Sequence, residues 1–528
     1  MSVILLSHGA DGPATDCVRA ALWRSFTAGQ VRHSCYGEFE LSTAAADEIF
    51  CLLNPGDGEQ GLLERLLKRN TKILIFGAMG ESLAASVGLR AAPLGTIPDL
   101  EGLASAELTT DRPYDTSPGC LVYEPHPLLA RLPLGQRPLV RYDFTDEWNS
   151  LGFGRIATDG GIWSLAQRVE AAGAAPLAQV WCGDTPVTAY AAIAAVADSA
   201  VLWFNRAVGP LDSLEWTIVE TFCSDYRPGD LPCIPYLMEV PVGYTGVATM
   251  RLDCDQAIVT ARPLAELYAE RGVPLSLAVV TGLPPAQEDL TFLKQLLAQG
   301  GAVVSHSRTH PPNWGADYAQ ALGEAKESKA WLEQHLPELG PVHYAVSPFH
   351  QNPPYAVQAL AAAGYLGFVA GVIHNDPEYL LARSGQVPHC EQPLVSHSQQ
   401  CMLHGDCYHR YGDSIAPYRE SFTNHFKAGV LFGYLDHPFS KAYQYGWDSE
   451  AERLSAHEQL LQFIQSHDGI WLPNLKQCLD FVYKRSLVSL SVRADQSLTV
   501  DRRSSAISLE DIPAVQVGWR GETRSISG

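Results

Sequence analysis

The chain has 528 residues, more than one hydrophobic core usually organises, so two or more domains are expected. Apolar residues make up 46% of it, enough for packed cores, which excludes a mainly disordered or fibrous protein. The net charge of −21 argues against binding to nucleic acids or anionic membranes, because both would be repelled. A neutral or amino-sugar substrate is compatible with this charge.

The cysteines and the first residues bear on the cellular compartment. Twelve cysteines are scattered rather than regularly paired, which is typical of reduced thiols in a cytoplasm. Residues 1–8 lack a basic segment, and their apolar run is too short for a signal peptide. No stretch of about 18 uninterrupted apolar residues occurs, so no membrane span is expected. We therefore expect a cytoplasmic protein.

The first half of the chain alternates short apolar runs with helical stretches. Strands are predicted at 3–7, 49–53, 72–76, 177–182 and 200–204, and helices at 15–27, 60–69 and 213–223. Strand–helix alternation of this kind predicts a mostly parallel, doubly wound α/β sheet over residues 1–240.

Proline-rich breaks over 226–243 indicate a domain junction. From Tyr244, strands are predicted at 247–252, 275–280, 302–305, 342–346, 367–371, 430–435 and 470–472, with helices at 260–270, 290–299, 316–335, 356–364 and 450–467. These βα units predict a distorted (β/α) barrel over residues 244–484. Alternating apolar residues after 485 predict a short β-rich appendage over 485–528.

Chemically capable side chains follow three of the predicted barrel strands. Asp253 and Asp255 stand at i and i+2 at one strand end, where both can face the same side. His306 and His310 stand at i and i+4 after another strand, a spacing that on a helical turn gives a metal ion two imidazoles. His437 follows the strand at 430–435. Each piece alone is compatible with a solvated turn or surface histidines, but together they predict a metal site with open positions.

The three pieces, in this order, resemble the signature of the NodB-homology polysaccharide deacetylases, the carbohydrate esterase family 4 group. His306-Ser307-Arg308-Thr309-His310 matches the second element of that signature, and Leu435-Asp436-His437-Pro438 matches the His-Pro core of the last. The resemblance covers residues 245–483. Two departures stand out: Cys254 separates the usually adjacent aspartates, and the wall motif, Val346-Ser347-Pro348-Phe349, lacks the Arg and Tyr of the family.

The resemblance implies roles for five side chains. Asp255, His306 and His310 would hold a divalent metal, with Zn²⁺ favoured because nitrogen and oxygen ligands in an open site suit it. Asp253 would take a proton from water, and His437 would give one to the leaving amine. Alternatively, Asp253 is a fourth ligand, and the chain then lacks its base.

The substrate-binding predictions concern three further positions. A backbone N–H near Phe349 would complete an oxyanion site, as in the family. Arg251 or Arg308 would replace the arginine that is missing from the wall motif.

The resemblance implies a metal-dependent hydrolase that removes an N-acetyl group from a sugar of a bacterial polysaccharide or of its cytoplasmic precursor. One alternative is an amidase of the same superfamily that acts on a small cyclic or linear amide. Another, from a different functional class, is a glycan-binding protein that has lost catalysis.

Two motifs in the first half are discounted. Gly77-Ala78-Met79-Gly80-Glu81 resembles the nucleophile elbow of class I glutamine amidotransferases, but Met79 occupies the place of the cysteine, and a thioether cannot attack an acyl carbon. The N-terminal domain is therefore expected to be non-catalytic. Residues 56–61 spell Gly-x-Gly-x-x-Gly, which is better explained as a turn before a helix than as a dinucleotide site.

Residues 388–410 are rich in Cys and His, namely His389, Cys390, His397, Cys401, His404, Cys407 and His409. They could form a second metal site, although the cysteine spacing matches no standard zinc knuckle. Alternatively, this segment is a loop insertion that lines the mouth of the active site.

Overall fold

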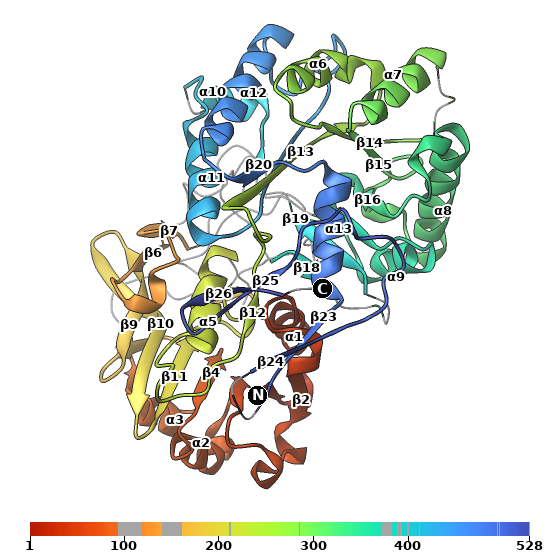
Figure 1. Ribbon diagram of the computed structural model, residues 1–528. Helices are drawn as coiled ribbons and strands as arrows, with labels where there is room; N and C mark the ends of the chain where they lie inside the picture. Colours follow the sequence, from red (N-terminus) through yellow and green to blue (C-terminus); the bar gives the residue numbers. More distant parts are fainter. Residues whose placement is uncertain are drawn as a thin grey trace.

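The computed structural model describes residues 1–92, 119–139, 161–210, 213–282, 284, 286–370, 383–387, 390, 393–398, 401–410, 412–493, 495 and 497–526. Two large sheets organise the chain, seen in Figure 1 as a red-to-yellow part and a green-to-blue part. The predicted α/β class is confirmed, and the domain limits at 240, 244 and 484 stay predictions.

Among the described residues, the N-terminal sheet has the strand order β2-β1-β3-β4-β11-β10-β9-β6-β7. The first five are parallel: β2 (Val31–Cys35), β1 (Val3–Ser7), β3 (Ile49–Leu53), β4 (Lys72–Phe76) and β11 (Ser199–Phe204). Alternate residues of β1 pack on opposite faces, Leu5 with α1 (Gly12–Phe26) and Leu6 with α2 (Gln60–Leu67). Helices therefore cover both faces of this part, as the doubly wound prediction requires.

The other part of this sheet is antiparallel, so the mostly parallel sheet predicted here is wrong for it. It contains β10 (Thr185–Val196), β9 (Ala175–Cys182), β6 (Gly119–Tyr123) and β7 (Gln136–Pro138). Two-residue turns join β9 to β10 and β10 to β11, and such short turns leave no room for a crossover helix. The long strand β10 has no counterpart among the predicted strands, because its alanine-rich sequence favours a helix.

The second sheet has the order β18-β19-β17-β16-β15-β14-β13-β21-β20, with β22 (Ile470–Trp471) paired to β13. Its strands are β13 (Gly246–Cys254), β14 (Ser276–Val279), β15 (Ala302–Ser305), β16 (Tyr344–Val346), β17 (Gly367–Ala370), β18 (Gly385–Gln386), β19 (Val395–Ser398), β20 (Cys401–Met402) and β21 (Phe432–Asp436). Every pair is parallel except β18 with β19. Within the described residues the path ends at β18 and β20 without closing, which fits a distorted barrel.

Helices separate the strands of this second sheet and lie around it in Figure 1. They are α6 (Arg262–Glu270), α7 (Gln287–Ala298), α8 (Tyr318–His335), α9 (Pro354–Ala362), α10 (Gly405–Arg410), α11 (Ala416–Ala428), α12 (Glu450–Gln465) and α13 (Leu475–Ser486). Most βα units therefore lie where the apolar pattern predicts them, whereas α10, α11 and α13 were not predicted.

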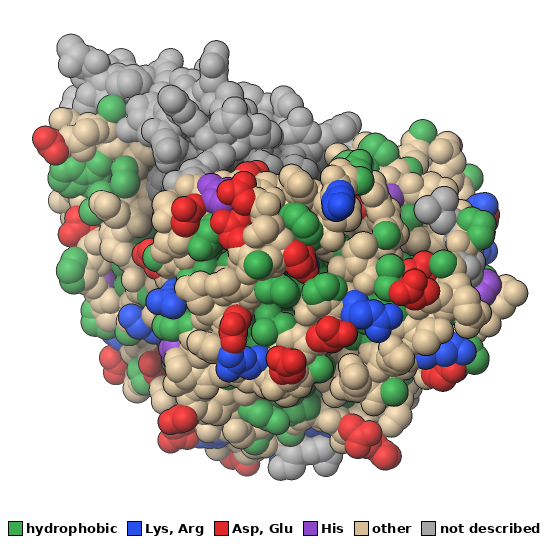
Figure 2. All heavy atoms as spheres, turned by 90° about the horizontal axis from the view of Figure 1, so that it is seen from above, with side chains coloured by type: hydrophobic (Ala, Val, Ile, Leu, Met, Phe, Trp, Pro, Cys, Tyr) green, Lys and Arg blue, Asp and Glu red, His purple; other side chains and the backbone are tan. Residues whose placement is uncertain are grey.

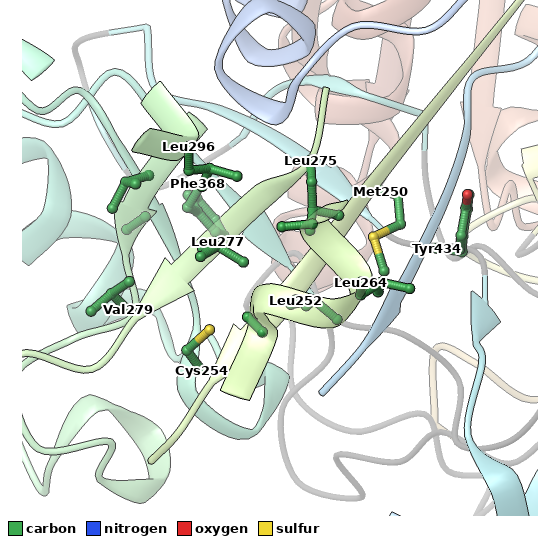
Figure 3. Close-up of a cluster of buried hydrophobic side chains, with 14 of the residues drawn as sticks. Met250, Leu252, Cys254, Leu264, Leu275, Leu277, Val279, Leu296, Phe368 and Tyr434 are labelled. Carbon is green, nitrogen blue, oxygen red and sulfur yellow. The ribbon is translucent and has the colours of Figure 1, made fainter. Parts of the chain in front are cut away.

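The core between β13 and its helices sets the direction of the functional side chains. Met250, Leu252 and Cys254 of β13 are buried with apolar residues of α6 and β14 (Figure 3). Because side chains alternate along a strand, Arg251 and Asp253 point to the opposite face, toward the inside of the sheet's curve. Burial of the apolar set thus places two charged groups inside the barrel.

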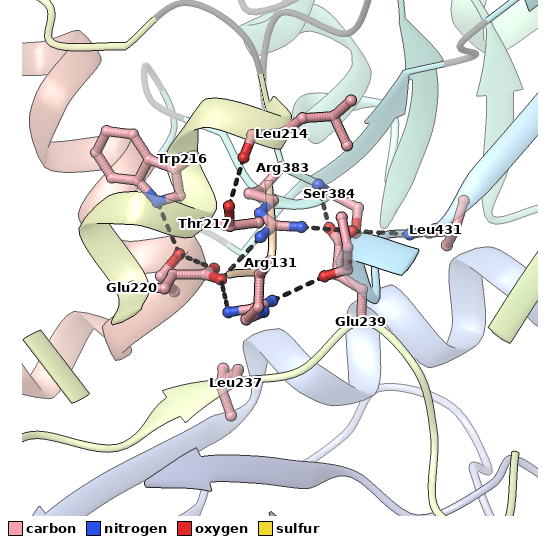
Figure 4. A network of polar contacts seen from close by, with 12 residues as sticks. Arg131, Leu214, Trp216, Thr217, Glu220, Leu237, Glu239, Arg383, Ser384 and Leu431 are labelled. Carbon is pink, nitrogen blue, oxygen red and sulfur yellow. Dashed lines mark hydrogen bonds and ion pairs between the residues drawn. The ribbon is translucent and has the colours of Figure 1, made fainter. Parts of the chain in front are cut away.

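A buried network of charges joins the N-terminal half to the barrel (Figure 4). The guanidinium of Arg383 contacts Glu220 of α5 (Ser213–Ser224) at 2.8 Å and Glu239 of the junction at 3.4 Å. Glu239 also accepts hydrogen bonds from the amides of Ser384 at 2.8 Å and Leu431 at 3.0 Å. The start of β21, which leads to His437, is therefore anchored to the junction.

The C-terminal residues form the predicted β structure, but they pack on the junction. A hairpin joins β23 (Val488–Val492) to β24 (Leu498–Arg502), and β25 (Gln516–Trp519) pairs with β26 (Glu522–Ser525) and with β12 (Tyr236–Leu237) of the junction. The indole of Trp519 is buried and donates a hydrogen bond to the Cys233 carbonyl at 2.7 Å. In Figure 1 these dark blue strands run between the two large sheets.

The surface carries both signs of charge. Figure 2 shows Lys and Arg side chains interspersed with Asp and Glu on the face seen from above, and no continuous basic patch is visible among its described residues. None of the described helices is long and apolar enough to cross a membrane.

Candidate metal centre and active site

The loops after β13, β15 and β21 bring four of the predicted side chains together. The Oδ1 atom of Asp255 lies 3.3 Å from Nε2 of His306 and 3.6 Å from Nε2 of His310. The Oδ2 atom of Asp255 lies 3.7 Å from Nε2 of His437. Because these strands are parallel, their carboxyl ends meet at one edge, which is why residues so distant in sequence converge.

The helical turn predicted for the two histidines after β15 is wrong. Ser307 and His310 have φ angles of 64° and 56°, and the segment is an irregular loop. The Oγ atom of Ser307 accepts a hydrogen bond from the His310 amide at 2.9 Å, and the amide of Arg308 donates to Glu324 at 2.8 Å. These bonds close the loop so that the rings of His306 and His310 lie 4.6 Å apart. The i, i+4 spacing therefore works here without a helix.

The donor set fits a divalent cation. The Nδ1 atom of His306 lies 3.0 Å from the Val346 carbonyl, which only accepts, so Nδ1 carries the proton and Nε2 of the neutral ring has a free lone pair. The Oδ1 atom of Asp255 is buried and accepts no hydrogen bond. One ligand atom each from Asp255, His306 and His310 lie within 4.8 Å of one another. Two imidazoles and a carboxylate suit Zn²⁺ and similar ions.

The protonation states of Asp255 and His310 also suit a metal site. Burial favours a raised pKa for Asp255, but the neighbouring His306, His437 and His310 lower it to about 2. Burial and the nearby His306 lower the pKa of His310 to about 4. Burial would also lower the pKa of His306, but Asp253 and Asp255 raise it. Near neutral pH, Asp255 is thus ionised and His310 is neutral, the forms that bind metals.

Asp253 is held by Arg251 rather than by the metal group. The guanidinium of Arg251 donates two hydrogen bonds to the Asp253 carboxylate, at 2.6 and 2.9 Å, and both side chains are buried. Burial would raise the pKa of Asp253, but Arg251, followed by His306, holds it far below the usual range. Arg251 therefore makes the contact with Asp253 that the prediction for this arginine requires.

His437 has a buried polar surrounding. Its own pKa is lowered to about 4 by burial and by the adjacent His404. The preceding residue, Asp436, accepts a hydrogen bond from Arg453 at 2.7 Å and contacts Nε2 of His457 at 2.9 Å. Burial would raise the pKa of Asp436, but Arg453 and His457 keep it well below its ordinary value. The carboxylate of Asp436 thus stays ionised beside the candidate acid.

Of the other two predicted substrate-binding residues, Phe349 lies beside the cluster, whereas the Arg308 side chain forms an ion pair with α8. Phe349 is 40% exposed, and its ring centroid is 4.7 Å from that of His310, so it borders the cluster. The Arg308 side chain is exposed and pairs with Glu327 of α8. Its predicted role in place of the wall arginine thus has no support from these contacts.

Two residues near the cluster were not assigned to it from the sequence. The ring of Tyr445 stacks on that of His437 with centroids 4.0 Å apart and planes 12° apart, and its hydroxyl donates to Oδ2 of Asp255 at 3.2 Å. His404 places Nε2 at 2.9 Å from Nδ1 of His437. The histidine-rich segment gave a signal for His404, whereas no pattern in the sequence marks Tyr445.

The Cys/His-rich segment lies partly outside the described residues, including His389 and the side chain of Cys407. Within the described part, no group of candidate metal ligands contains a cysteine. His404 belongs to a buried group of candidate metal ligands with Asp436 and His437, and His409 belongs to a separate, more exposed group with Asp448 and Glu452. The first-half motifs have the expected local form: residues 56–61 turn into α2, and Met79 lies buried between β4 and α3 (Glu81–Ser86).

No protein-family model matches the sequence, and no curated protein matches it. Solved polysaccharide deacetylases are similar in structure to somewhat under half of the chain. A Mycobacterium smegmatis protein assigned as one has 15% identity and a TM-score of 0.37, over 46% of this chain and 92% of that one. A Pseudomonas aeruginosa PAO1 protein with the same assignment has 14% identity and a TM-score of 0.35, over 45% of this chain and 90% of that one. The chitin deacetylase of the fungal pathogen Colletotrichum lindemuthianum has 13% identity and a TM-score of 0.31, over 46% of this chain and 92% of that one.

Proposed function

We propose that this protein is a metal-dependent amide hydrolase that removes an N-acetyl group from a sugar of a bacterial polysaccharide or of its cytoplasmic precursor. The convergence of Asp255, His306 and His310 on one point, with Asp253 and His437 beside it, carries the proposal. This set contains ligands for a cation, a candidate base and a candidate acid, which are the groups that amide hydrolysis needs.

Asp255, His306 and His310 would hold the cation, and Zn²⁺ is the metal that their donor atoms favour. When bound, such a cation supplies Lewis-acid polarisation of a carbonyl and lowers the pKa of a bound water. Neighbouring groups orient these ligands. The Val346 carbonyl fixes the tautomer of His306, and the Tyr445 hydroxyl hydrogen-bonds to Asp255.

Asp253 would accept a proton from the attacking water. Its bidentate bond to Arg251 keeps the carboxylate ionised and fixes its orientation, and each oxygen retains a lone pair for a further hydrogen bond. The three-ligand group does not include Asp253, which supports the role of a base over that of a fourth ligand.

His437 would give a proton to the leaving nitrogen, which departs poorly as an anion. Its Nε2 faces the cluster, at 3.7 Å from Asp255, and is therefore the atom that would donate.

The exposed aromatic side chains beside the cluster suit a sugar. Phe349 is 40% exposed next to His310, and Tyr443 is 48% exposed with its ring 5.8 Å from that of Tyr445, which stacks on His437. These exposed aromatic rings would pack on the apolar face of a pyranose ring. The net charge of −21 favours a neutral substrate over a polyanionic one.

The test is release of acetate from N-acetylglucosamine oligomers by the full chain loaded with Zn²⁺. Wild type should release acetate, and Asp253→Asn should lose at least about 100-fold in kcat while it keeps its bound metal. The matched control is Asp468→Asn, at an exposed aspartate in the turn before β22, and should retain wild-type turnover.

Two results would favour one of the alternative functions over deacetylation. If wild type releases no acetate but hydrolyses a small cyclic amide with the same dependence on Asp253, the alternative amidase function is correct. A protein that binds no metal and still binds the oligomers in equilibrium dialysis would instead be a non-catalytic glycan-binding protein.

A further inference from the structure

His404 lies against the edge of the candidate acid. It follows β20, whose Met402 is in register with Leu435 of β21, and the Leu403 amide continues the ladder with a 2.8 Å bond to the Leu435 carbonyl. The two strands thus run side by side, and the residues that follow them, His404 and His437, meet at 2.9 Å between Nε2 and Nδ1. Both histidines are at least 90% buried.

The spacing of the two rings indicates a hydrogen bond rather than a second metal site. Two nitrogen ligands on one tetrahedral Zn²⁺ stand about 3.3 Å apart, given Zn–N distances of about 2.0–2.1 Å. The 2.9 Å separation of His404 and His437 is shorter and is typical of an N–H···N hydrogen bond. Asp436, the third candidate ligand, already binds Arg453 and His457 through Oδ2, and its Oδ1 is 3.9 Å from His404.

A second contact fixes the plane of the same ring. Tyr445 stacks on the face of His437, while His404 holds its Nδ1 edge. The amide of Gly405, directly after His404, donates to the Tyr445 carbonyl at 3.0 Å, so the two contacts support each other. These contacts hold one face and the Nδ1 edge of the His437 ring, and its Nε2 atom points toward the metal-ligand cluster.

We propose that His404 is a positioning residue that retains a proton on Nδ1 of His437, so that the proton released to the substrate comes from Nε2. This inference rests on the proposed function. In the donating state His437 carries protons on both ring nitrogens, and Nδ1–H donates to the lone pair of His404 Nε2. As the C–N bond breaks, its electron pair stays on the leaving nitrogen, which takes the Nε2 proton. His437 is left neutral with its remaining proton on Nδ1, while the proton from water resides on Asp253.

Comparing an amide substrate with an ester substrate distinguishes a role of His404 in proton donation from a merely structural role. An acetamido sugar needs a protonated leaving nitrogen, whereas the phenolate of 4-nitrophenyl acetate leaves without a proton. In the Zn²⁺-loaded protein, His404→Phe should lower kcat for N-acetylglucosamine oligomers at least about 100-fold with KM changed less than 3-fold, and lower hydrolysis of the ester less than about 5-fold. His404→Gln, whose amide oxygen can accept the hydrogen bond, should recover at least about 10-fold on the oligomers. The control His335→Phe, at the end of α8, should match wild type.

A second readout does not depend on turnover. In ¹⁵N-histidine spectra of the metal-free chain, the resonances that disappear in His437→Gln identify His437. Wild type should show the neutral ring protonated at Nδ1, and His404→Phe should show a shift toward the Nε2–H form.

Equal losses on amide and ester, or an unchanged tautomer in His404→Phe, would overturn the role of His404 and leave the deacetylase proposal standing. Two metal ions per wild-type chain with one lost in His404→Phe would also overturn it. A wild type that hydrolyses no amide would refute the proposed function, and the tautomer would still decide whether His404 controls Nδ1.

Discussion

Glu239 lies in the buried charge network between the two halves and gives a quantitative prediction of stability against pH (Figure 4). Its carboxylate pairs with Arg383 and Arg485 and accepts hydrogen bonds from Ser384 and from the Leu431 amide. Burial alone would raise the pKa of Glu239, but Arg383, Arg485 and the hydrogen-bond donors lower it from 4.5 to about 2.

A carboxyl whose pKa is depressed on folding stabilises the folded state above its unfolded pKa, and the stabilisation is lost as the pH falls toward the folded value. For Glu239 this window runs from about pH 4.5 down to about pH 2. The full effect is about 3 kcal/mol at pH 7, since each pKa unit is worth about 1.4 kcal/mol. We therefore expect Glu239→Gln to lower the free energy of unfolding by about 3 kcal/mol at pH 7 and by about 2 kcal/mol at pH 3.5.

The assay is urea unfolding of wild type and Glu239→Gln at pH 7, 5 and 3.5, followed by tryptophan fluorescence. Glu510→Gln, an exposed glutamate of the tail, serves as control and should change the free energy of unfolding by less than about 0.5 kcal/mol at every pH. A Glu239→Gln effect below about 1 kcal/mol at pH 7, or one that grows as the pH falls, would refute the assignment of Glu239 as the charged anchor of the junction.

Three further predictions test other parts of the structure. Arg251→Met leaves a buried carboxylate without its partner and should lower the free energy of unfolding by about 3–5 kcal/mol, whereas Arg308→Met, at an exposed pair, should cost less than about 1 kcal/mol in the same urea titration. Tyr445→Phe removes the hydroxyl that hydrogen-bonds to Asp255 and should weaken Zn²⁺ binding about 10-fold in isothermal titration calorimetry; unchanged affinity would contradict this support. Trp519→Ala removes a buried indole from the tail–junction interface and should cost about 3–5 kcal/mol in urea unfolding, while a loss under 1 kcal/mol would show that the tail does not stabilise the fold.

Much of the barrel could be predicted from the sequence because its strands are short, buried and separated by amphipathic helices. The predicted positions of β13, β15 and β21 agree with the structure to within about two residues, and these are the strands that deliver the site. The antiparallel part of the N-terminal sheet could not be predicted in this way, since the alanine-rich β10 carries no alternating pattern and its pairing depends on distant strands.

In the candidate site, too, some residues could be predicted from the sequence and others could not. His306, His310 and His437 stand in fixed spacing next to apolar strands, so their sequence context marked them. The bond between Arg251 and Asp253 follows from alternation along one strand, although the sequence did not distinguish Arg251 from Arg308. The contacts of Tyr445 and His404 with His437 depend on loop conformations that no periodicity encodes.

The central claim is that Asp255, His306 and His310 together bind one divalent cation beside Asp253 and His437. Crystals of the full chain soaked in Zn²⁺, with anomalous diffraction recorded at the zinc edge, test it directly. We predict one strong anomalous peak per chain with Asp255, His306 and His310 as ligands at about 2.0–2.2 Å. Zinc bound only at other side chains, or none at all, would contradict the claim.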